Sequence, residues 1–337
     1  MPDNETFTLS IVVPAYNEAD VLPEFHRRLS AVMESLNCPW EVLYINDGST
    51  DDTIDVMHQL HEAHIAIIDL SRNFGKEIAL TAGLDHASGD AVVVIDADLQ
   101  DPPEVIPELV EKWQEGFDVV YARRTARDGE TFFKKLSAKG FYRVIQRVSR
   151  VKIPADTGDF RLLSRRAVNA LSRLREQHRF MKGLFAWIGY PQTAVYYHRE
   201  PRFAGQSKWD YWLLWNFALE GITSFSIAPL KFATYVGILT SVGAFSYALF
   251  IIYSTLVYGV SVKGYPSLMV VILFLGGVQL MAIGVIGEYL GRMFNETKRR
   301  PLYFVQDLLP SVMTMNRSSA ASTTNTGPHE TQNMTGI

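Results

Sequence analysis

The stretch VVVIDADLQDPPE, from Val92 to Glu104, joins two different patterns. Its first half is a run rich in β-branched residues, which is typical of a strand buried on both faces of a parallel sheet. Its second half brings the carboxylates of Asp96, Asp98 and Asp101 within six positions. Because side chains two positions apart in an extended segment share a face, Asp96 and Asp98 are predicted to point the same way at the carboxyl end of a strand.

The position of these carboxylates predicts a ligand site. Open α/β sheets bind ligands at the carboxyl ends of their strands, and burying two carboxylates without compensation is costly. A divalent cation that prefers oxygen ligands, Mg²⁺ or Mn²⁺, would compensate them, and Gln100 would add a carbonyl ligand. A D-x-D pair is equally typical of a helix cap followed by a solvated turn, so both interpretations stay open at this point.

The first ~120 residues alternate short β-rich runs with helical patterns, which predicts βαβ units on a parallel sheet. The predicted strands are LSIVVP, EVLYIN, IAIIDL, AVVVIDA and DVVYA, and the first predicted helix runs from Glu18 to Leu36. Since the carboxyl ends of parallel strands lie at one edge of a sheet, the loops that follow these strands are expected to meet.

These loops contain side chains suited to a nucleotide. Tyr16 follows the first strand, placed to stack or hydrogen-bond, and Asp47 follows the second, placed to hydrogen-bond a base or ribose. Arg72 and Lys76 follow the third strand and bring positive charge to the same edge. Carboxylates that could bind a metal are thus expected beside basic side chains that could bind phosphates, and this combination predicts a nucleoside diphosphate site. Neither G-x-G-x-x-G after the first strand nor G-x-x-x-x-G-K-[ST] occurs, which disfavours dinucleotide oxidoreductases and P-loop NTPases.

The second half of the chain contains two long apolar stretches. No charged residue occurs from Phe232 to Val262 or from Gly264 to Gly287, and each stretch exceeds the ~20 residues that a spanning helix needs. Basic residues flank the pair: Lys231 precedes it, and Arg292, Lys298, Arg299 and Arg300 follow it. The positive-inside rule therefore predicts that both ends lie in the cytoplasm. A buried helical hairpin in a soluble core is the alternative.

Two further segments are expected to touch lipid. Residues 123–152 contain ten Lys or Arg against two acidic residues, with apolar side chains interleaved, which predicts a loop leading into a basic amphipathic helix on anionic lipid; a solvated helix face packed on the sheet is the alternative. Trp209, Tyr211, Trp212 and Trp215 are typical of an interfacial segment at the headgroup level. The net charge of −4 excludes a polycation built for nucleic acid.

Taken together, PAYNE, NDGSTDDT, DADLQDPPE and RFAGQSKW make the chain resemble a family 2 glycosyltransferase. Within that family it is similar to the polyprenyl-phosphate sugar transferases, the group that contains dolichyl-phosphate mannose synthase. TGDFRLLSRRAV, RFMKGLFAWIGY and the two apolar stretches add a likeness to bacterial bactoprenol glucosyltransferases. The resemblance covers about Thr8 to Gln306. It implies a Rossmann-like α/β domain of the glycosyltransferase A type, which binds a nucleotide diphosphate sugar.

The expected division of the chain follows from these patterns. A cytoplasmic glycosyltransferase domain is predicted over residues 1–206 and interfacial amphipathic helices over 207–229. Two transmembrane helices are predicted within 230–291, at about 232–258 and 267–290, and a cytoplasmic C-terminal segment over 292–337. The end of that segment is rich in Ser, Thr and Asn, which predicts disorder from about Ser311.

The resemblance implies roles for residues of the matching motifs. The residues expected to bind the donor are Pro14, Tyr16, Glu18, Asp47 and Asp96. Lys76 is added to them because it is expected at the same edge of the sheet. The metal set is Asp96, Asp98 and Gln100. The catalytic set is Asp98, Asp159, Arg124 and Arg127, of which the two arginines would meet phosphate and Asp159 would sit by the reaction centre. The set for the acceptor phosphate is Arg202, Ser207 and Lys208.

The implied reaction is an inverting, metal-dependent transfer of one hexose to undecaprenyl or another polyprenyl phosphate, giving a lipid-linked sugar for modification of a cell-surface glycan such as O-antigen. Glucose from UDP-glucose is the specific expectation, and the expected place is the cytoplasmic face of the bacterial inner membrane. A lipid phosphate is anionic at neutral pH, with a second pKa near ~6, so a strong general base is unnecessary. Asp159 would then orient the acceptor or stabilise positive charge at the anomeric carbon; a loop-capping Asp is the alternative.

Two other functions stay open at this point, as do the donor and the oligomeric state, for which a homo-oligomer is compatible with the sequence. A processive polysaccharide synthase would carry a Q-x-x-R-W element, but Gln177 to Phe180 reads QHRF and has the wrong spacing. A non-catalytic, lipid-binding membrane protein that kept the fold is disfavoured by the intact acidic cluster and by RFAGQSK.

Overall fold

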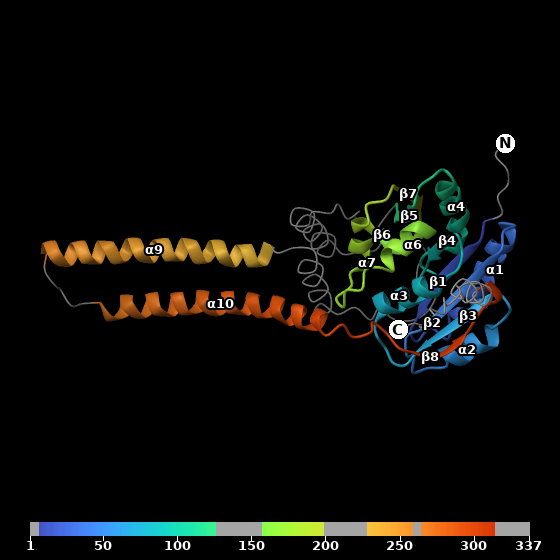
Figure 1. Ribbon diagram of the computed structural model, residues 1–337, viewed down its shortest axis with the longest axis horizontal. Helices are drawn as coiled ribbons and strands as arrows, with labels where there is room; N and C mark the ends of the chain where they lie inside the picture. Colours follow the sequence, from blue (N-terminus) through green and yellow to red (C-terminus); the bar gives the residue numbers. More distant parts are fainter. Residues whose placement is uncertain (1–6, 126–156, 199–227, 259–263, 314–337) are drawn as a thin grey trace, which may run out of the picture.

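In the computed structural model, an eight-stranded sheet carries helices on both faces, and two long helices run side by side away from it (Figure 1). The structure describes residues 7–125, 157–198, 228–258 and 264–313. The elements in chain order are β1 (Leu9–Ala15), α1 (Leu22–Ser35), β2 (Trp40–Asn46), α2 (Thr53–Leu60), β3 (Ile65–Leu70), α3 (Lys76–His86), β4 (Ala91–Val94), η1 (Pro103–Val105), α4 (Ile106–Gln114), β5 (Val119–Arg124), β6 (Thr157–Ser164), α6 (Arg165–Leu171), α7 (Met181–Trp187), β7 (Gln192–Tyr197), α9 (Ala228–Tyr258), α10 (Tyr265–Thr297) and β8 (Val305–Leu309).

The strand order across the sheet is β7-β5-β6-β4-β1-β2-β3-β8. The four inner strands β4, β1, β2 and β3 pair in parallel, as the βαβ pattern predicts. Strands β6 and β8 run antiparallel to their neighbours, and neither was predicted from the sequence. The sheet is therefore mixed, and its antiparallel strands come from parts of the chain remote from the βαβ units.

Both faces of the sheet are covered, which explains why the strands are largely apolar. Leu9, Ile11 and Val13 of β1 pack with buried residues of α1 and α4 in one cluster. Val12 points to the other face and packs with buried residues of α3, α6 and α7. Since side chains alternate between faces, a strand buried on both sides is apolar at most positions; Ser10 and Glu41 are buried polar exceptions that hydrogen-bond to each other at 2.6 Å.

The first helix begins later than predicted, at Leu22 rather than at Glu18. The intervening residues form turns, in which Asn17 has a positive φ of 55°. The Glu18 backbone N–H donates to Thr53 Oγ1 at 2.9 Å, which holds this residue in the loop. Pro23 then lies in the first turn of α1, where a missing backbone N–H is tolerated.

The topological switch point of the sheet lies between β1 and β4. The chain places β2 and β3 on one side of β1 and crosses over to place β4 on the other. The β1–β4 register ends at Val12 and Val94, followed by one hydrogen bond from the Ile95 N–H to the Val12 carbonyl at 3.1 Å. Pro14 comes next in β1 and has no N–H to donate. The two strands stop pairing where open α/β sheets bind their ligands.

Helices α9 and α10 are long and apolar enough to cross a membrane by length and composition. They have 31 and 33 residues, about 45–50 Å at 1.5 Å per residue. Large apolar side chains stay exposed along both, such as Leu256 on α9 and Leu280 on α10. Because a hydrocarbon core is only about 30 Å thick, α10 is long enough to continue beyond it.

The end of α10 contacts the α/β domain. Glu296 Oε1 accepts from the Gln177 backbone N–H at 2.7 Å, and the Gln177 side chain donates to the Arg300 carbonyl at 2.5 Å. Asn295 Nδ2 lies 3.1 Å from His178 Nε2. This helix extends past the predicted end near residue 290, and its last turn fixes how the helix leaves the domain.

The chain after α10 returns to the sheet, where β8 pairs with β3 (Figure 1). The Phe304 carbonyl accepts from the Ser71 N–H at 3.0 Å, and the Tyr303 hydroxyl donates to Asp85 Oδ2 at 2.9 Å. The Ser311 hydroxyl donates to Glu41, and both side chains are fully buried. Disorder was expected from about Ser311, whereas the described residues continue to 313 and Ser311 is fully buried.

We expect this returning segment to stabilise the sheet. Deletion of residues 301–337 should lower the free energy of unfolding by about 3 kcal/mol or more, because it exposes the edge of β3 and removes a donor to the buried carboxylate of Glu41. Denaturant unfolding of the full chain in detergent measures the change. The control is deletion of residues 314–337, which keeps all of these contacts; equal unfolding of the two deletions would contradict the expectation.

Candidate functional site

The loops after β1 and β2 are locked together at the switch point. The Asn17 N–H donates to Ser49 Oγ at 3.0 Å, and the Asn17 side chain accepts from the Thr50 N–H at 2.8 Å. These contacts join the PAYNE and NDGSTDDT motifs into one unit. Tyr16 lies beside them and is 36% exposed, which leaves its ring accessible to a ligand.

Asp47 holds the next loop. Its two carboxylate oxygens accept from the backbone N–H groups of Phe74, at 2.7 Å, and Gly75, at 3.0 Å. Burial raises the pKa of Asp47, and these two hydrogen bonds act against that rise. Asp47 thus fixes the chain immediately before α3, on which Lys76 is the first residue. Its predicted contact with a nucleoside stays a prediction.

Gly48 allows the loops after β2 and β3 to approach. Its φ is +63°, and a Cβ atom there would lie 2.4 Å from the carbonyl carbon of Arg72 and from the backbone nitrogen of Asn73. Neither obstacle is a flexible side chain, so only glycine fits. The Arg72 guanidinium lies over the Phe74 ring, 3.9 Å from its centroid, which places its charge at the same edge.

The centre of the site is an ammonium group between two carboxylates. Lys76 Nζ lies 2.7 Å from Asp96 Oδ2 and 2.8 Å from Asp159 Oδ2. Asp96 follows β4, whereas Asp159 lies near the start of β6. Because β6 is antiparallel to β4, its first residues lie at the edge where β4 ends. Within the described residues, Asp96 Oδ1 and Asp159 Oδ1 are buried and accept no hydrogen bond.

The charges around this centre have unequal effects on the two carboxylates. Burial raises the pKa of Asp96, and the nearby Asp159 charge adds to the rise while Lys76 acts against it. Burial would also raise the pKa of Asp159, but Lys76, Lys182 and Arg161 hold it well below its usual range. Asp159 is therefore kept as a carboxylate.

Arg161 positions Asp159. Its guanidinium donates to the backbone carbonyls of Gly158, at 2.7 Å, and Asp159, at 3.2 Å, and lies 3.8 Å from the centroid of the Phe185 ring. The side chain is buried and lies two residues from Asp159 on the same strand. The motif TGDFRLL gave no sign of this role for Arg161.

Asp98 and Gln100 lie in the turn after β4 and not on a strand. The strand ends at Val94, and Asp98 Oδ1 accepts from the Gln100 N–H at 3.1 Å. Ala97 and Leu99 are buried in the core, so the acidic positions still alternate with apolar ones. Asp98 thus closes a turn within its own loop, and the shared direction of Asp96 and Asp98 stays a prediction.

A divalent ion fits the donor atoms here only in part. Asp96 Oδ1 is an unpartnered, buried carboxylate oxygen, the kind of atom that a hard cation prefers. In the described part of the chain, no group of three or more His, Cys, Asp or Glu residues is arranged to hold a metal. An ion at this place would need further ligands from a bound molecule or from water.

Arg124 reaches the same edge from β5. Its Nε atom donates to the Tyr197 hydroxyl at 3.2 Å, and its Nη2 atom lies 3.8 Å from Asp101 Oδ1. The Tyr197 hydroxyl in turn donates to Asp101, which is buried. The sequence predicted no role for Asp101 within its acidic cluster, and none for Tyr197, since β7 carries no motif that points to the site.

Four predicted site residues lie outside the described residues: Arg127, Arg202, Ser207 and Lys208. So do nearly all of the basic segment 123–152 and the predicted interfacial helices 207–229. Pro14 and Glu18 are described, Pro14 within the buried strand β1 and Glu18 in the loop after it.

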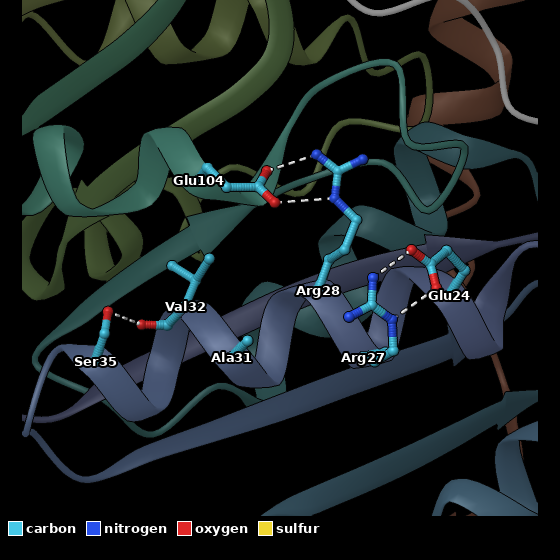
Figure 2. A pocket seen from close by; sticks show the side chains of 7 residues that line it. All are labelled: Glu24, Arg27, Arg28, Ala31, Val32, Ser35 and Glu104. Carbon is cyan, nitrogen blue, oxygen red and sulfur yellow. Dashed lines mark hydrogen bonds and ion pairs between the residues drawn. The ribbon is translucent and has the colours of Figure 1, made fainter.

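A shallow groove of about 530 Å³ lies away from this site, on the outer side of α1 (Figure 2). Its charged side chains are already paired: Arg28 with Glu104 at 2.7 Å, and Arg27 with Glu24 at 2.7 Å. None of its lining residues belongs to the cluster of Lys76, Asp96 and Asp159, so we assign it no part in the chemistry.

Gly48 provides a test of the loop packing. We expect Gly48→Ala to cost about 2–4 kcal/mol of stability and to weaken binding of a nucleoside diphosphate, because the Cβ atom would push the backbone of residues 72 and 73 away. Thermal unfolding and calorimetric titration with UDP measure both effects. Gly116→Ala is the control: φ there is also positive, at +102°, but a Cβ would meet no atom within 4 Å. Equal UDP affinity in the two variants would contradict the expectation.

Glu77 provides a pH-dependent test. Burial, and then the charge of Asp159, raise the pKa of Glu77 from 4.5 to about 7. The folded state thus binds this proton more tightly than the unfolded chain, so the stability it contributes is present below pH 4.5 and is lost as the pH rises through about 7. We expect the free energy of unfolding, relative to that of Glu77→Gln, to fall by about 3 kcal/mol across this window.

Denaturant unfolding at a series of pH values measures this difference. Glu108→Gln, on the exposed side of α4, is the control. A Glu77→Gln variant whose pH profile is parallel to that of the unmodified protein would contradict the expectation.

Comparison with known proteins agrees with this geometry. The model of the glycosyl transferase family 2 matches residues 10–172, and that of the GtrB C-terminal hairpin matches residues 228–293, which include α9 and most of α10. The first match covers the switch point with Asp47, Lys76, Asp96 and Asp159. The predicted α/β fold of the glycosyltransferase A type is thereby confirmed.

Curated relatives match over nearly the whole chain. An uncharacterized glycosyltransferase of Synechocystis sp. is 58% identical over 305 residues, which are 90% of this chain and 96% of that protein. The bactoprenol glucosyl transferase of Shigella phage SfV is 48% identical over 89% of this chain and 98% of that protein. A prophage bactoprenol glucosyl transferase homolog of Escherichia coli is 47% identical over 88% of this chain and 98% of that protein. The chain is therefore a glycosyltransferase that belongs to glycosyl transferase family 2 and carries the GtrB C-terminal hairpin.

Proposed function

We propose that this enzyme transfers a hexose from a nucleotide sugar to a polyprenyl phosphate, with UDP-glucose as the donor and undecaprenyl phosphate as the acceptor. The observation that carries the proposal is the pair of carboxylates, Asp96 and Asp159, held by Lys76 at the switch point with one unpartnered oxygen each. The names of the relatives from Shigella phage and Escherichia coli support glucose and the lipid acceptor.

The donor would lie across the carboxyl ends of β1, β2 and β4. Its nucleoside would contact the loop from Pro14 to Glu18, beside Asp47. Asp96, Asp98 and Gln100 would hold Mg²⁺ or Mn²⁺, with the donor diphosphate completing the ligand set, since the described carboxylates alone do not. When bound, such an ion neutralises the charge that develops on the departing nucleoside diphosphate.

The displacement itself needs little from the protein. A phosphate oxygen of the lipid forms the new bond to the anomeric carbon as the bond from that carbon to the diphosphate breaks, which inverts the centre. The lipid phosphate is already anionic at neutral pH, so no residue has to remove a proton. Asp159, kept ionised by Lys76, would stabilise positive charge on the sugar ring in the transition state.

The remaining basic side chains would bind the phosphate groups of the donor and of the acceptor. Arg124 lies near the site, where its pairing with Asp101 and Tyr197 orients it, and Arg127 would join it on the donor side. Arg202, Ser207 and Lys208 would hold the acceptor phosphate close to the membrane. These assignments, apart from the place of Arg124, rest on the sequence motifs.

The membrane arrangement follows from the hairpin. Helices α9 and α10 would span the bacterial cytoplasmic membrane, and the basic residues that flank them would keep both ends, with the α/β domain, in the cytoplasm. The amphipathic segment 207–229 would lie at the interface. The product would be a lipid-linked hexose for a later step of cell-surface glycan modification.

The test uses the purified full chain in detergent with undecaprenyl phosphate, a panel of UDP- and GDP-sugars, and Mg²⁺ or Mn²⁺, with EDTA as the control. We expect a lipid-linked monosaccharide from UDP-glucose that EDTA abolishes. Asp159→Asn should lower turnover by about 100-fold or more while UDP-glucose still binds, because it removes a charge needed only in the transition state. Asp55→Asn, on the exposed face of α2, is the matched control.

Other outcomes would replace this function. A soluble polymer would identify a processive synthase, and donor binding without any product would identify a non-catalytic protein. A product that forms equally well in EDTA would contradict the metal assignment alone.

A further inference from the structure

Lys76 occupies the place that a cation would take. Its ammonium bridges Asp96 and Asp159 at 2.7 and 2.8 Å, so one positive charge serves two carboxylates. The start of its helix is held by the hydrogen bonds from Phe74 and Gly75 to Asp47. The backbone that leads into Lys76 is therefore held in place, and a rotation of the side chain is enough to change the partners of the ammonium.

We propose that Lys76 is a built-in counter-cation of the donor-free site, which leaves Asp96 when a divalent ion binds and then stays paired with Asp159. This inference rests on the proposed function, because the ion belongs to the donor. Lys76 acts here as a positioning residue. It keeps the site neutralised while the donor is absent and holds Asp159 in place when the donor is bound.

The exposed fractions of the three side chains indicate which of the two contacts of Lys76 breaks when the ion binds. The Lys76 side chain is 45% exposed, Asp96 is 27% exposed and Asp159 is 10% exposed. The long, flexible stem of lysine can swing toward the open side, whereas Asp159 is enclosed and its backbone is held by Arg161. Asp96 is the more accessible carboxylate, and its Oδ1 atom is unpartnered.

Electrostatics sets the direction of the exchange. Two like-charged cations at one carboxylate repel each other, so a divalent ion and the Lys76 ammonium compete for Asp96. Asp159 is the more enclosed of the two carboxylates and its backbone is held by Arg161, so the interaction of Lys76 with Asp159 is the one expected to persist.

The competition predicts a gain in metal affinity when the lysine is removed. Lys76→Met should bind Mn²⁺ about tenfold more tightly than the unmodified protein in the absence of any donor, because one competing charge is gone. Lys76→Arg keeps the charge and should bind Mn²⁺ about as the unmodified protein does. Paramagnetic resonance of free Mn²⁺ measures this on the full chain in detergent, without any activity assay.

Lys182→Met is the matched control. Lys182 acts on Asp159 through its charge, but the described structure shows no ion pair between it and Asp96, so we expect a smaller change in Mn²⁺ affinity. Asp96→Asn should abolish the gain when combined with Lys76→Met. Thermal unfolding of each variant shows that it is folded.

A second measurement uses the unmodified chain and so does not depend on the folding of Lys76→Met. The Lys76 amine should be acetylated slowly without metal and faster with Mg²⁺, because it then has one carboxylate partner, Asp159, in place of two. Mass spectrometry follows the reaction. In Asp96→Asn the reaction should be fast without Mg²⁺.

Two results would overturn the inference: Mn²⁺ binding by folded Lys76→Met that is no tighter than in the unmodified protein, or Lys76 acetylation that Mg²⁺ leaves unchanged. If Lys76→Met does not fold, the acetylation result decides. The proposed function is judged separately by the lipid-linked product, so either proposal can fail without the other.

Discussion

Negative charge has to be compensated at the edge of the sheet where β1 and β4 part, and the protein compensates each carboxylate differently. Asp47 accepts two backbone N–H groups, Asp96 and Asp159 share the Lys76 ammonium, and Asp101 accepts from the Tyr197 hydroxyl near Arg124. The hydrogen bonds to Asp47 fix a loop, and the contacts of Asp101 join β5 and β7 to the site. Among the described residues, buried carboxylate oxygens without a hydrogen-bond partner occur at Asp96 and Asp159, which is why the chemistry is expected there.

The helical hairpin is connected to this edge through the chain that follows it. The end of α10 contacts Gln177, and the returning segment hydrogen-bonds Ser71, next to the Arg72 backbone that packs against Gly48. Farther along, β8 closes the sheet and Ser311 contributes to the buried hydrogen bonds of Glu41. The helical hairpin and the loops proposed to hold a nucleotide are thus joined by a short run of backbone.

Much of the site was predictable because its residues follow buried strands within βαβ units. Asp96, Asp47 and Lys76 were placed at one edge from strand order alone, and the structure brings Asp96 and Lys76 into contact. Asp159 was placed there only through the resemblance to a family. Arg161 and Tyr197 carry no local pattern that separates them from ordinary strand residues, so their contacts with Asp159 and Asp101 were missed.

Short-range patterns of side chains were enough to predict the parallel centre of the sheet, the acidic cluster after β4 and the two long apolar helices. The antiparallel direction of β6 and β8 was not predictable in this way, because their partners lie far away in the chain. The same holds for the burial of Ser311 and for the contact of Lys76 with two carboxylates. A hydrogen bond or ion pair between remote residues depends on where the fold places them, and no local periodicity records it.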